Sequence, residues 1–239
     1  MLTKTELLKI LLDNLRIARN LRASAKNDTP LLNSKVFLKT HQVERLKKTH
    51  EDLLMSSDTR DAALFFLNEI YSFKDLSKRD NDLERLLPTL GKMFPESILE
   101  VIAKAMILDA LTEQLETKMA TKLGLSFTKE QYYEAYRQET SYEERLTQLN
   151  LVKDLGYSLC GLVKLPFVAP TLKIMAMPAR LAKLSEVHDF LNSGFNTFTN
   201  TNNPENFINT LVEREKFILD IIFDRGYDWQ DHIDTYYKA

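Results

Sequence analysis

The sequence has few of the residues that metal and nucleotide sites require. Its 239 residues include one cysteine, four histidines and six glycines. The glycines are isolated or widely spaced, so no glycine-rich loop can cradle a pyrophosphate. Gly156 and Gly161 have the spacing of a phosphate loop, but Leu162 and Val163 follow where Lys and Ser or Thr are required. The sequence therefore argues against nucleotide binding.

The histidines and the cysteine are also too scattered for metal chemistry. Di-iron bundles need two Glu-x-x-His motifs, and this sequence has none. The spacing of zinc ligands is missing too, and we predict no metal and no cofactor. The lone Cys160 lies in an apolar helix, where a buried and inert thiol is the favoured interpretation. A single cysteine fits a reducing compartment, so a cytoplasmic location is expected.

Neither charge nor hydropathy indicates a nucleic-acid partner or a membrane span. The 32 Lys and Arg nearly balance the 34 Asp and Glu, so no global field attracts anionic partners. Residues 1–60 carry 12 basic and 7 acidic residues, whereas residues 185–239 carry 4 and 10. This asymmetry favours attraction between the two ends, within one chain or between two copies. The most apolar stretch, Leu155 to Met177, is interrupted by Lys164 and Lys173, so it is too short to cross a bilayer and is interpreted as a buried core segment.

The helical spacing of apolar residues predicts an all-α fold. Seven prolines and six glycines are few for a fold with many tight turns. Glu96 to Leu123 is the clearest helix, because its apolar residues recur with a period of 3.6. Ser141 and Glu144 match a capping box, and Asn203 with Pro204 predicts the start of the last long helix. No segment alternates with the period of a β-strand, so no sheet is expected.

These elements predict one compact bundle of about nine or ten helices with proline-kinked segments. Residues 1–56 are expected to form a helical pair that packs on a bundle of residues 57–239, as a single domain. A helix is expected over residues 58–71, and another begins near Ser77 and stops before Pro95. Three prolines are expected to cut the later chain into short pieces: Pro166, Pro170 and Pro178.

The densest polar cluster lies between Tyr71 and Arg85 and is the first candidate site. Arg79 and Arg85 offer forked donors for an anionic or polar ligand, with acidic residues such as Asp80 to orient them. A structural interpretation is favoured over this one. Asp80 suits the positive start of a helix, and Asp82 and Arg85 have the spacing of an ordinary helical charge pair.

Other candidates have equally ordinary explanations. His188 lies on the apolar stripe of its helix, where a half-buried histidine satisfied by a neighbour is favoured over a ligand or base. The tyrosines at 132, 133 and 136 could line a ligand pocket, but aromatic residues at helical spacing usually serve packing. The basic first 60 residues lack a recognition turn and a lysine-dense arm, so nucleic-acid binding is not expected.

Three segments carry a resemblance to a known group of proteins. They are FFLNEIYSFKDLSKRDNDLERLLPTL, MAMPARLAKLSEVHDFLNSGFNTF and FINTLVEREKFILDIIF, in that order. The first has the pattern FFLxxIYxxxDxxxRDxDLERxLP. Together they resemble an uncharacterised family of all-helical bacterial proteins, a domain of unknown function. The resemblance implies a one-domain bacterial helical protein and brings no activity.

The most distinctive parts of the resemblance are the RD pair at Arg79 and Asp80 and the PAR segment that ends at Arg180. We expect these three residues to lie close together, with Tyr71 and His188 nearby. Two interpretations stay open. The cluster is either a ligand-binding site or a set of buried ion pairs that fixes the register of the helices.

The leading functional hypothesis is an interaction protein without catalytic activity, which binds a protein partner or a second copy of itself as a homodimer. It rests on the many amphipathic helices and on the lack of a catalytic signature. The alternative is a bundle with an internal pocket for an apolar or acidic small ligand, formed around Phe65, Phe66, Tyr132, Tyr136 and Leu155 to Met177. A third hypothesis, an arginine-centred enzyme site, requires the arginines to face a concave pocket.

Overall fold

The structure is all-α, as the sequence predicts. The computed structural model describes residues 2–70, 77–181 and 185–224, and these ranges contain eleven α-helices, one π-helical turn and no strand. The helices are α1 (Lys4–Lys26), α2 (Thr29–Thr49), α3 (Glu51–Met55), α4 (Arg60–Phe65), the π-helical turn η1 (Phe66–Ile70), α5 (Ser77–Met93), α6 (Glu96–Leu123), α7 (Lys129–Glu139), α8 (Tyr142–Leu162), α9 (Val168–Leu181), α10 (Ser185–Asn200) and α11 (Pro204–Phe223). None of these helices is long and apolar enough to cross a membrane.

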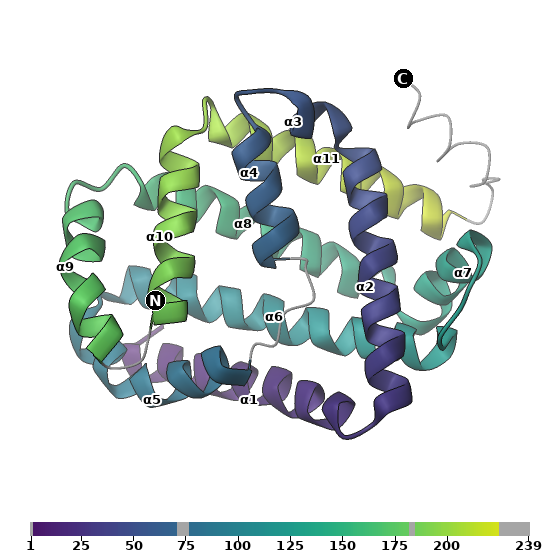
Figure 1. Cartoon of the computed structure of the whole chain (residues 1–239), viewed down its shortest axis with the longest axis horizontal. Coiled ribbons are helices and arrows are strands. Elements are labelled where there is room, and N and C mark those ends of the chain that lie inside the picture. The colour runs from purple at the N-terminus through teal and green to yellow at the C-terminus, as the bar shows by residue number, and fades with distance from the viewer. Residues whose placement is uncertain (1, 71–76, 182–184, 225–239) are drawn as a thin grey trace.

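The 28-residue helix α6 runs through the middle of the bundle, as Figure 1 shows. α1 packs along α6, and α5 lies beside α1. α8 packs on another side of α6 and carries α11, while α2 contacts α6 near the opposite end from α9. α9 packs on α10 and forms an outer edge of the molecule in this view. The fold therefore combines an inner helix, surrounding helices and an outer helix α9 that packs on α10.

Three clusters of buried apolar side chains fill the spaces between these helices. One lies between α1, α5 and α6 and includes the fully buried Leu11. A second joins α2, α6, α7 and α11 and contains Tyr132 and Tyr133, so these two tyrosines serve packing. The third joins α3, α4, α8, α10 and α11 around Phe66 and Phe207. Each cluster joins helices that are distant in the sequence.

Several predicted helix starts are confirmed in atomic detail. The Ser141 side chain accepts a hydrogen bond from the Glu144 N–H, and the Glu144 carboxylate accepts one from the Ser141 N–H at 2.8 Å. This reciprocal pair is the predicted capping box. Asn203 adopts a left-handed conformation with φ of 47°, and its side-chain oxygen accepts from the Asn206 N–H at 3.2 Å. Pro204 follows as the first residue of α11.

Two expectations about helix continuity need correction. The helix expected over residues 58–71 is α-helical only to Phe65, after which the chain widens into the π-helical turn η1. The expected cuts at Pro170 and Pro178 are wrong, because α9 runs through both residues. Pro170 is the third residue of α9, where a missing N–H costs the helix no internal hydrogen bond.

The expectation that Leu155 to Met177 is a buried core segment is wrong for its second half. α8 buries Cys160, and this burial raises the pKa of the Cys160 thiol, as expected of an inert cysteine. The chain leaves α8 after Leu162, and α9 then packs on α10. α9 forms an outer edge of the molecule in Figure 1, and its Ile174 and Met177 side chains reach solvent.

Candidate functional site

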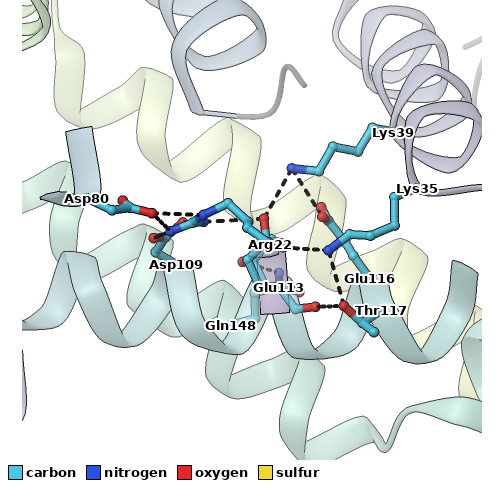
Figure 2. Close-up of polar contacts among 10 residues, drawn as sticks. Arg22, Lys35, Lys39, Asp80, Asp109, Glu113, Glu116, Thr117 and Gln148 are labelled. Atoms are coloured by element: carbon cyan, nitrogen blue, oxygen red, sulfur yellow. Dashed lines mark hydrogen bonds and ion pairs between the residues drawn. The ribbon is translucent and has the colours of Figure 1, made fainter. Parts of the chain in front are cut away.

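Seven charged side chains from four helices form a buried cluster, which we call the ionic network. Its α6 carboxylates occupy positions 109, 113 and 116, and steps of four and three residues place them on one helix face. α1 adds a guanidinium, α2 adds two ammonium groups and α5 adds a carboxylate (Figure 2). The members are Arg22, Lys35, Lys39, Asp80, Asp109, Glu113 and Glu116.

Arg22 connects α1 to both α5 and α6. Its Nη2 lies 2.6 Å from Oδ2 of Asp80, a residue with no exposed surface. Nη1 and Nη2 also donate to the two carboxylate oxygens of Asp109, at 3.1 and 3.0 Å. Burial disfavours the charge of Arg22, but the surrounding carboxylates outweigh this effect and raise the pKa of Arg22 above its usual value. Arg22 is therefore a permanent cation held among fixed anions.

The two lysines of α2 complete the network. Lys35 Nζ lies 2.5 Å from Oε2 of Glu113 and donates to Oγ1 of Thr117 at 3.1 Å. Lys39 Nζ lies 3.1 Å from Oε2 of Glu116. Burial would lower the pKa of Lys39, yet the charges of Glu116 and Glu113 raise it. Burial is also the largest cause that raises the pKa of Glu116, with the nearby charge of Glu113 acting in the same direction.

These contacts make a closed network and not an open cleft. Guanidinium and ammonium groups lie between the carboxylates, where a metal ion would otherwise be held. Within the described ranges no group of three or more His, Cys, Asp or Glu side chains is arranged to hold a metal ion. Paired buried charges contribute little net stability, but breaking one pair leaves an uncompensated charge. The network therefore fixes how α1, α2 and α5 sit on α6.

A second buried ion pair connects α2 to α11. The Arg45 guanidinium donates to both carboxylate oxygens of Glu215, at 2.9 and 2.7 Å. His50 Nε2 donates to the same carboxylate at 3.0 Å. Burial would raise the pKa of Glu215, but the charge of Arg45 and these hydrogen bonds lower it to about 2. The basic N-terminal part and the acidic C-terminal part thus do attract each other here, within one chain.

The predicted candidate residues are only partly described. Tyr71 lies outside the described residues. Arg79 belongs to α5 and Arg180 to α9, but the side chains of both lie outside the described part of the structure. Their expected closeness to Asp80 and His188 therefore stays a prediction. Asp80 itself binds Arg22, which the sequence did not suggest.

The two remaining candidates have structural partners. Arg85 Nη2 lies 3.2 Å from Oδ1 of Asp82, which is the expected helical charge pair. His188 is half-buried between α10 and α9, and its Nε2 donates to the backbone oxygen of Leu172 at 2.8 Å. Its Nδ1 lies 3.5 Å from Oδ1 of Asp189. His188 thus connects α10 to α9, as a histidine satisfied by its neighbours.

α9 presents an apolar surface to solvent, which we call the α9 face. Phe167 precedes the helix and is 55% exposed, while Ile174 is 72% and Met177 is 63% exposed. Steps of seven and three residues place these side chains on one side of the helical path, with the exposed Pro170 between them. Lys173 is exposed along the edge of this stripe. Such a stripe normally faces a core or a partner.

Two hollows border the described residues, and neither brings together Phe66 and Tyr132, which were expected to line one internal pocket. A cavity beside Phe66 and His50 measures about 20 Å³, which is room for about one water molecule. Phe66 belongs to the cluster around α8 and α11, whereas Tyr132 belongs to the cluster around α7. A separate hollow of about 200 Å³ lies at the surface between α7 and α11, bordered by Glu130 and Arg137. The aromatic residues expected to share a pocket are thus divided between two packed cores.

A comparison with known protein families shows which family the chain belongs to. The sequence profile of a family described as "Domain of unknown function (DUF8198)" matches residues 21–228. The chain belongs to this family. No curated protein and no solved structure matches it. The resemblance to a family of unknown function is therefore confirmed, and the match covers every described helix except the first part of α1.

Sequence reasoning missed most of the ionic network in this DUF8198 domain. One signal was available, because α6 is the clearest apolar helix and yet carries acidic residues at 109, 113 and 116 on a single face. The cations that pair with these carboxylates could not be assigned from the sequence, because Lys35 and Glu113 lie 78 residues apart in the chain. The α9 face was missed for a different reason. An apolar stripe has the same spacing whether it meets a core or a partner.

Proposed function

We propose that this DUF8198 domain is an interaction module without catalytic activity, and that it binds a partner through the α9 face. The observation that carries the proposal is the exposure of Phe167, Ile174 and Met177 on one side of a helix. Large apolar side chains gathered on a surface usually mark a binding site. The closed ionic network and the small cavity beside His50 favour this role over that of an enzyme or a small-ligand carrier.

The proposal includes the cytoplasmic location expected from the sequence. A lone cysteine that is buried in α8 needs no partner thiol and suits a reducing compartment. A protein partner and a second copy of the chain are the two kinds of partner that the sequence suggests. Both would cover the apolar stripe and remove it from water, which is the main source of favourable free energy in association.

Site-specific photocrosslinking tests the proposal in cells of the native host. Ile174 is replaced by the photocrosslinker p-benzoylphenylalanine, and a matched chain carries the same group at Met55. Met55 is 80% exposed but lies at the end of α3, away from the α9 face. We expect specific adducts from position 174 and not from position 55. Equal labelling from both positions, or no adduct from either, would contradict the proposal.

A further inference from the structure

The segment that contains α9 has a charge pattern unlike the rest of the chain. Residues 155–185 contain no Asp or Glu and four basic residues: Lys164, Lys173, Arg180 and Lys183. The whole chain has a net charge of −2, so this basic character is local. Lys164 pairs with Glu205 of α11 at 3.0 Å, whereas Lys173 is exposed at the edge of the apolar stripe of the α9 face. An apolar stripe with an exposed lysine at its edge, in a segment that has no acidic residue of its own, suits an anionic and apolar partner.

The shape of the α9 face narrows the choice of partner. α9 packs on α10 and forms an outer edge of the molecule in the view of Figure 1. Ile174 and Met177 are 72% and 63% exposed, so they protrude from the surface as a ridge and do not line a groove. The exposed side chains of Phe167, Ile174 and Met177 follow this ridge over about three turns of the helical path. A soft, flat surface can accept such a ridge without having a groove of matching shape.

We propose that α9 lies in the plane of an anionic membrane surface, with Phe167, Ile174 and Met177 inserted among the lipid headgroups and Lys173 near their phosphates. This inference rests on the proposed interaction function and names the partner of the same face. Interfacial helices of this type combine an apolar stripe with basic residues and lie along the bilayer without crossing it. α9 has 14 residues, fewer than the about 20 that a helix needs to cross a bilayer, so its length also agrees with a position along the membrane surface.

A second copy of the chain fits the α9 face less well. Pairing two α9 helices about a two-fold axis would bring basic segments together, because residues 155–185 supply no acidic side chain to separate them. Like charges at an interface oppose association. An anionic bilayer has the opposite charge and attracts each nearby Lys or Arg, which strengthens binding about fivefold per residue.

Sedimentation with vesicles tests this inference. The full chain is mixed with vesicles of phosphatidylcholine alone and with vesicles of phosphatidylcholine and phosphatidylglycerol. We expect binding to the second kind only, and weaker binding as salt rises. The double substitution Ile174→Ser and Met177→Ser should weaken binding at least about tenfold, because it removes two inserted apolar groups. Lys173→Glu should weaken it by about tenfold or more, because it reverses a charge near the phosphates.

Matched variants separate the α9 face from general surface effects. Met55→Ser removes an equally exposed apolar side chain from α3, and Lys47→Glu reverses an exposed charge on α2. Both should bind the anionic vesicles as the unmodified chain does. All five substituted positions are exposed, so circular dichroism and melting temperature should show that each variant folds.

The outcomes distinguish the inference from the function on which it rests. Vesicle binding that depends on position 174 supports both. If the chain binds no vesicle, or if the α9 and control variants bind alike, the membrane inference is wrong. In that case protein adducts from position 174, or a dimer detected by light scattering and lost in the double variant, would leave the interaction function standing. If neither adducts nor such a dimer are found, the proposed function is overturned as well.

Discussion

The ionic network and the α9 face depart from the usual distribution of residues in opposite ways. Globular proteins seldom bury Lys, Asp or Glu, yet Lys35 is 2% exposed and Asp80 is fully buried. Globular proteins also seldom gather large apolar side chains on the surface, yet Ile174 and Met177 lie together on α9. The buried charges have counter-charges in the same chain, whereas the apolar side chains of α9 face water.

This difference indicates where each region acts. Buried charges that are paired within the chain fix the arrangement of α1, α2, α5 and α6. Their charged groups pair with one another inside the fold. The α9 face leaves large apolar side chains exposed, and a partner that covered them would remove apolar surface from water. This difference supports the proposal that the first region stabilises the fold and that the second binds a partner.

Removal of Arg22 tests the first half of this comparison and should have the largest effect. Arg22→Met removes the guanidinium that pairs with the fully buried carboxylate of Asp80 and with Asp109, which should reduce the free energy of unfolding by about 3 to 5 kcal/mol. Urea denaturation measures this change. The control is Arg16→Met, because Arg16 pairs with Glu84 at the surface and should contribute at most about 1 kcal/mol. Equal effects of the two substitutions would show that the network is not important for stability.

The same measurement tests whether the chain is one domain. Arg22 joins α1 to α5 and α6, and Arg45 joins α2 to α11, so the N-terminal helical pair shares ion pairs with the rest. We therefore propose that residues 1–56 and 57–239 unfold together, in one transition. Two separate transitions in the urea curve of the unmodified chain would contradict this proposal.

Glu215 offers a pH-dependent test of the second buried ion pair. The pKa of Glu215 is about 2, below its ordinary value of 4.5, so the ionised form favours the folded state. This contribution is fully present above about pH 4.5 and is lost as the pH falls towards 2, and it amounts to about 3 kcal/mol. Glu215→Gln should therefore destabilise the chain at neutral pH but not near pH 2. A difference that stays constant over this range, measured by urea denaturation, would contradict the assignment.

Two glycines of α8 extend the comparison from charges to packing. A methyl group at Gly156 would lie 2.5 Å from Cδ1 of Ile208, a fully buried residue of α11. Gly156→Ala should therefore cost about 1 to 3 kcal/mol. Gly161 has no atom within 4 Å of the same position, so Gly161→Ala should stabilise α8 by about 0.5 to 1 kcal/mol. Thermal unfolding checks both signs, and stabilisation by Gly156→Ala would show that α8 and α11 are not tightly packed.

The sequence predicts the helices well because the signals for helices are local. Ser141 and Glu144 lie three residues apart, and their hydrogen bonds form within one turn. Asn203 and Pro204 likewise mark the start of α11 without help from distant residues. The change to a π-helical turn after Phe65 has no comparable local signal. Phe66, the first residue of that turn, packs against Phe207, which lies 141 residues further along the chain.

The candidate sites are harder to predict because they depend on distant neighbours. The sequence singles out Asp80 as a candidate, but Arg22, which pairs with it, lies 58 residues away and outside the segment that contains the candidate. For the side chains of α9, the sequence does not show that they lack neighbours in the fold. Ile174 and Met177 have the spacing of core residues, and only the position of α9 at the edge of the fold reveals that they are exposed.

The smallest expected effect belongs to the α9 face and completes the comparison. Ile174→Ser should change the free energy of unfolding by no more than about 0.5 kcal/mol, because a side chain that is 72% exposed loses little contact with the protein when it is shortened. Leu99→Ala is the buried control. Leu99 has no exposed surface, so this truncation should cost about 2 to 5 kcal/mol by opening a cavity beside α1. Urea denaturation measures both changes in the free energy of unfolding. A loss of stability in the Ile174 variant close to that of the Leu99 variant would mean that α9 is buried in the folded chain. The α9 face would then not be free to bind a membrane or a protein.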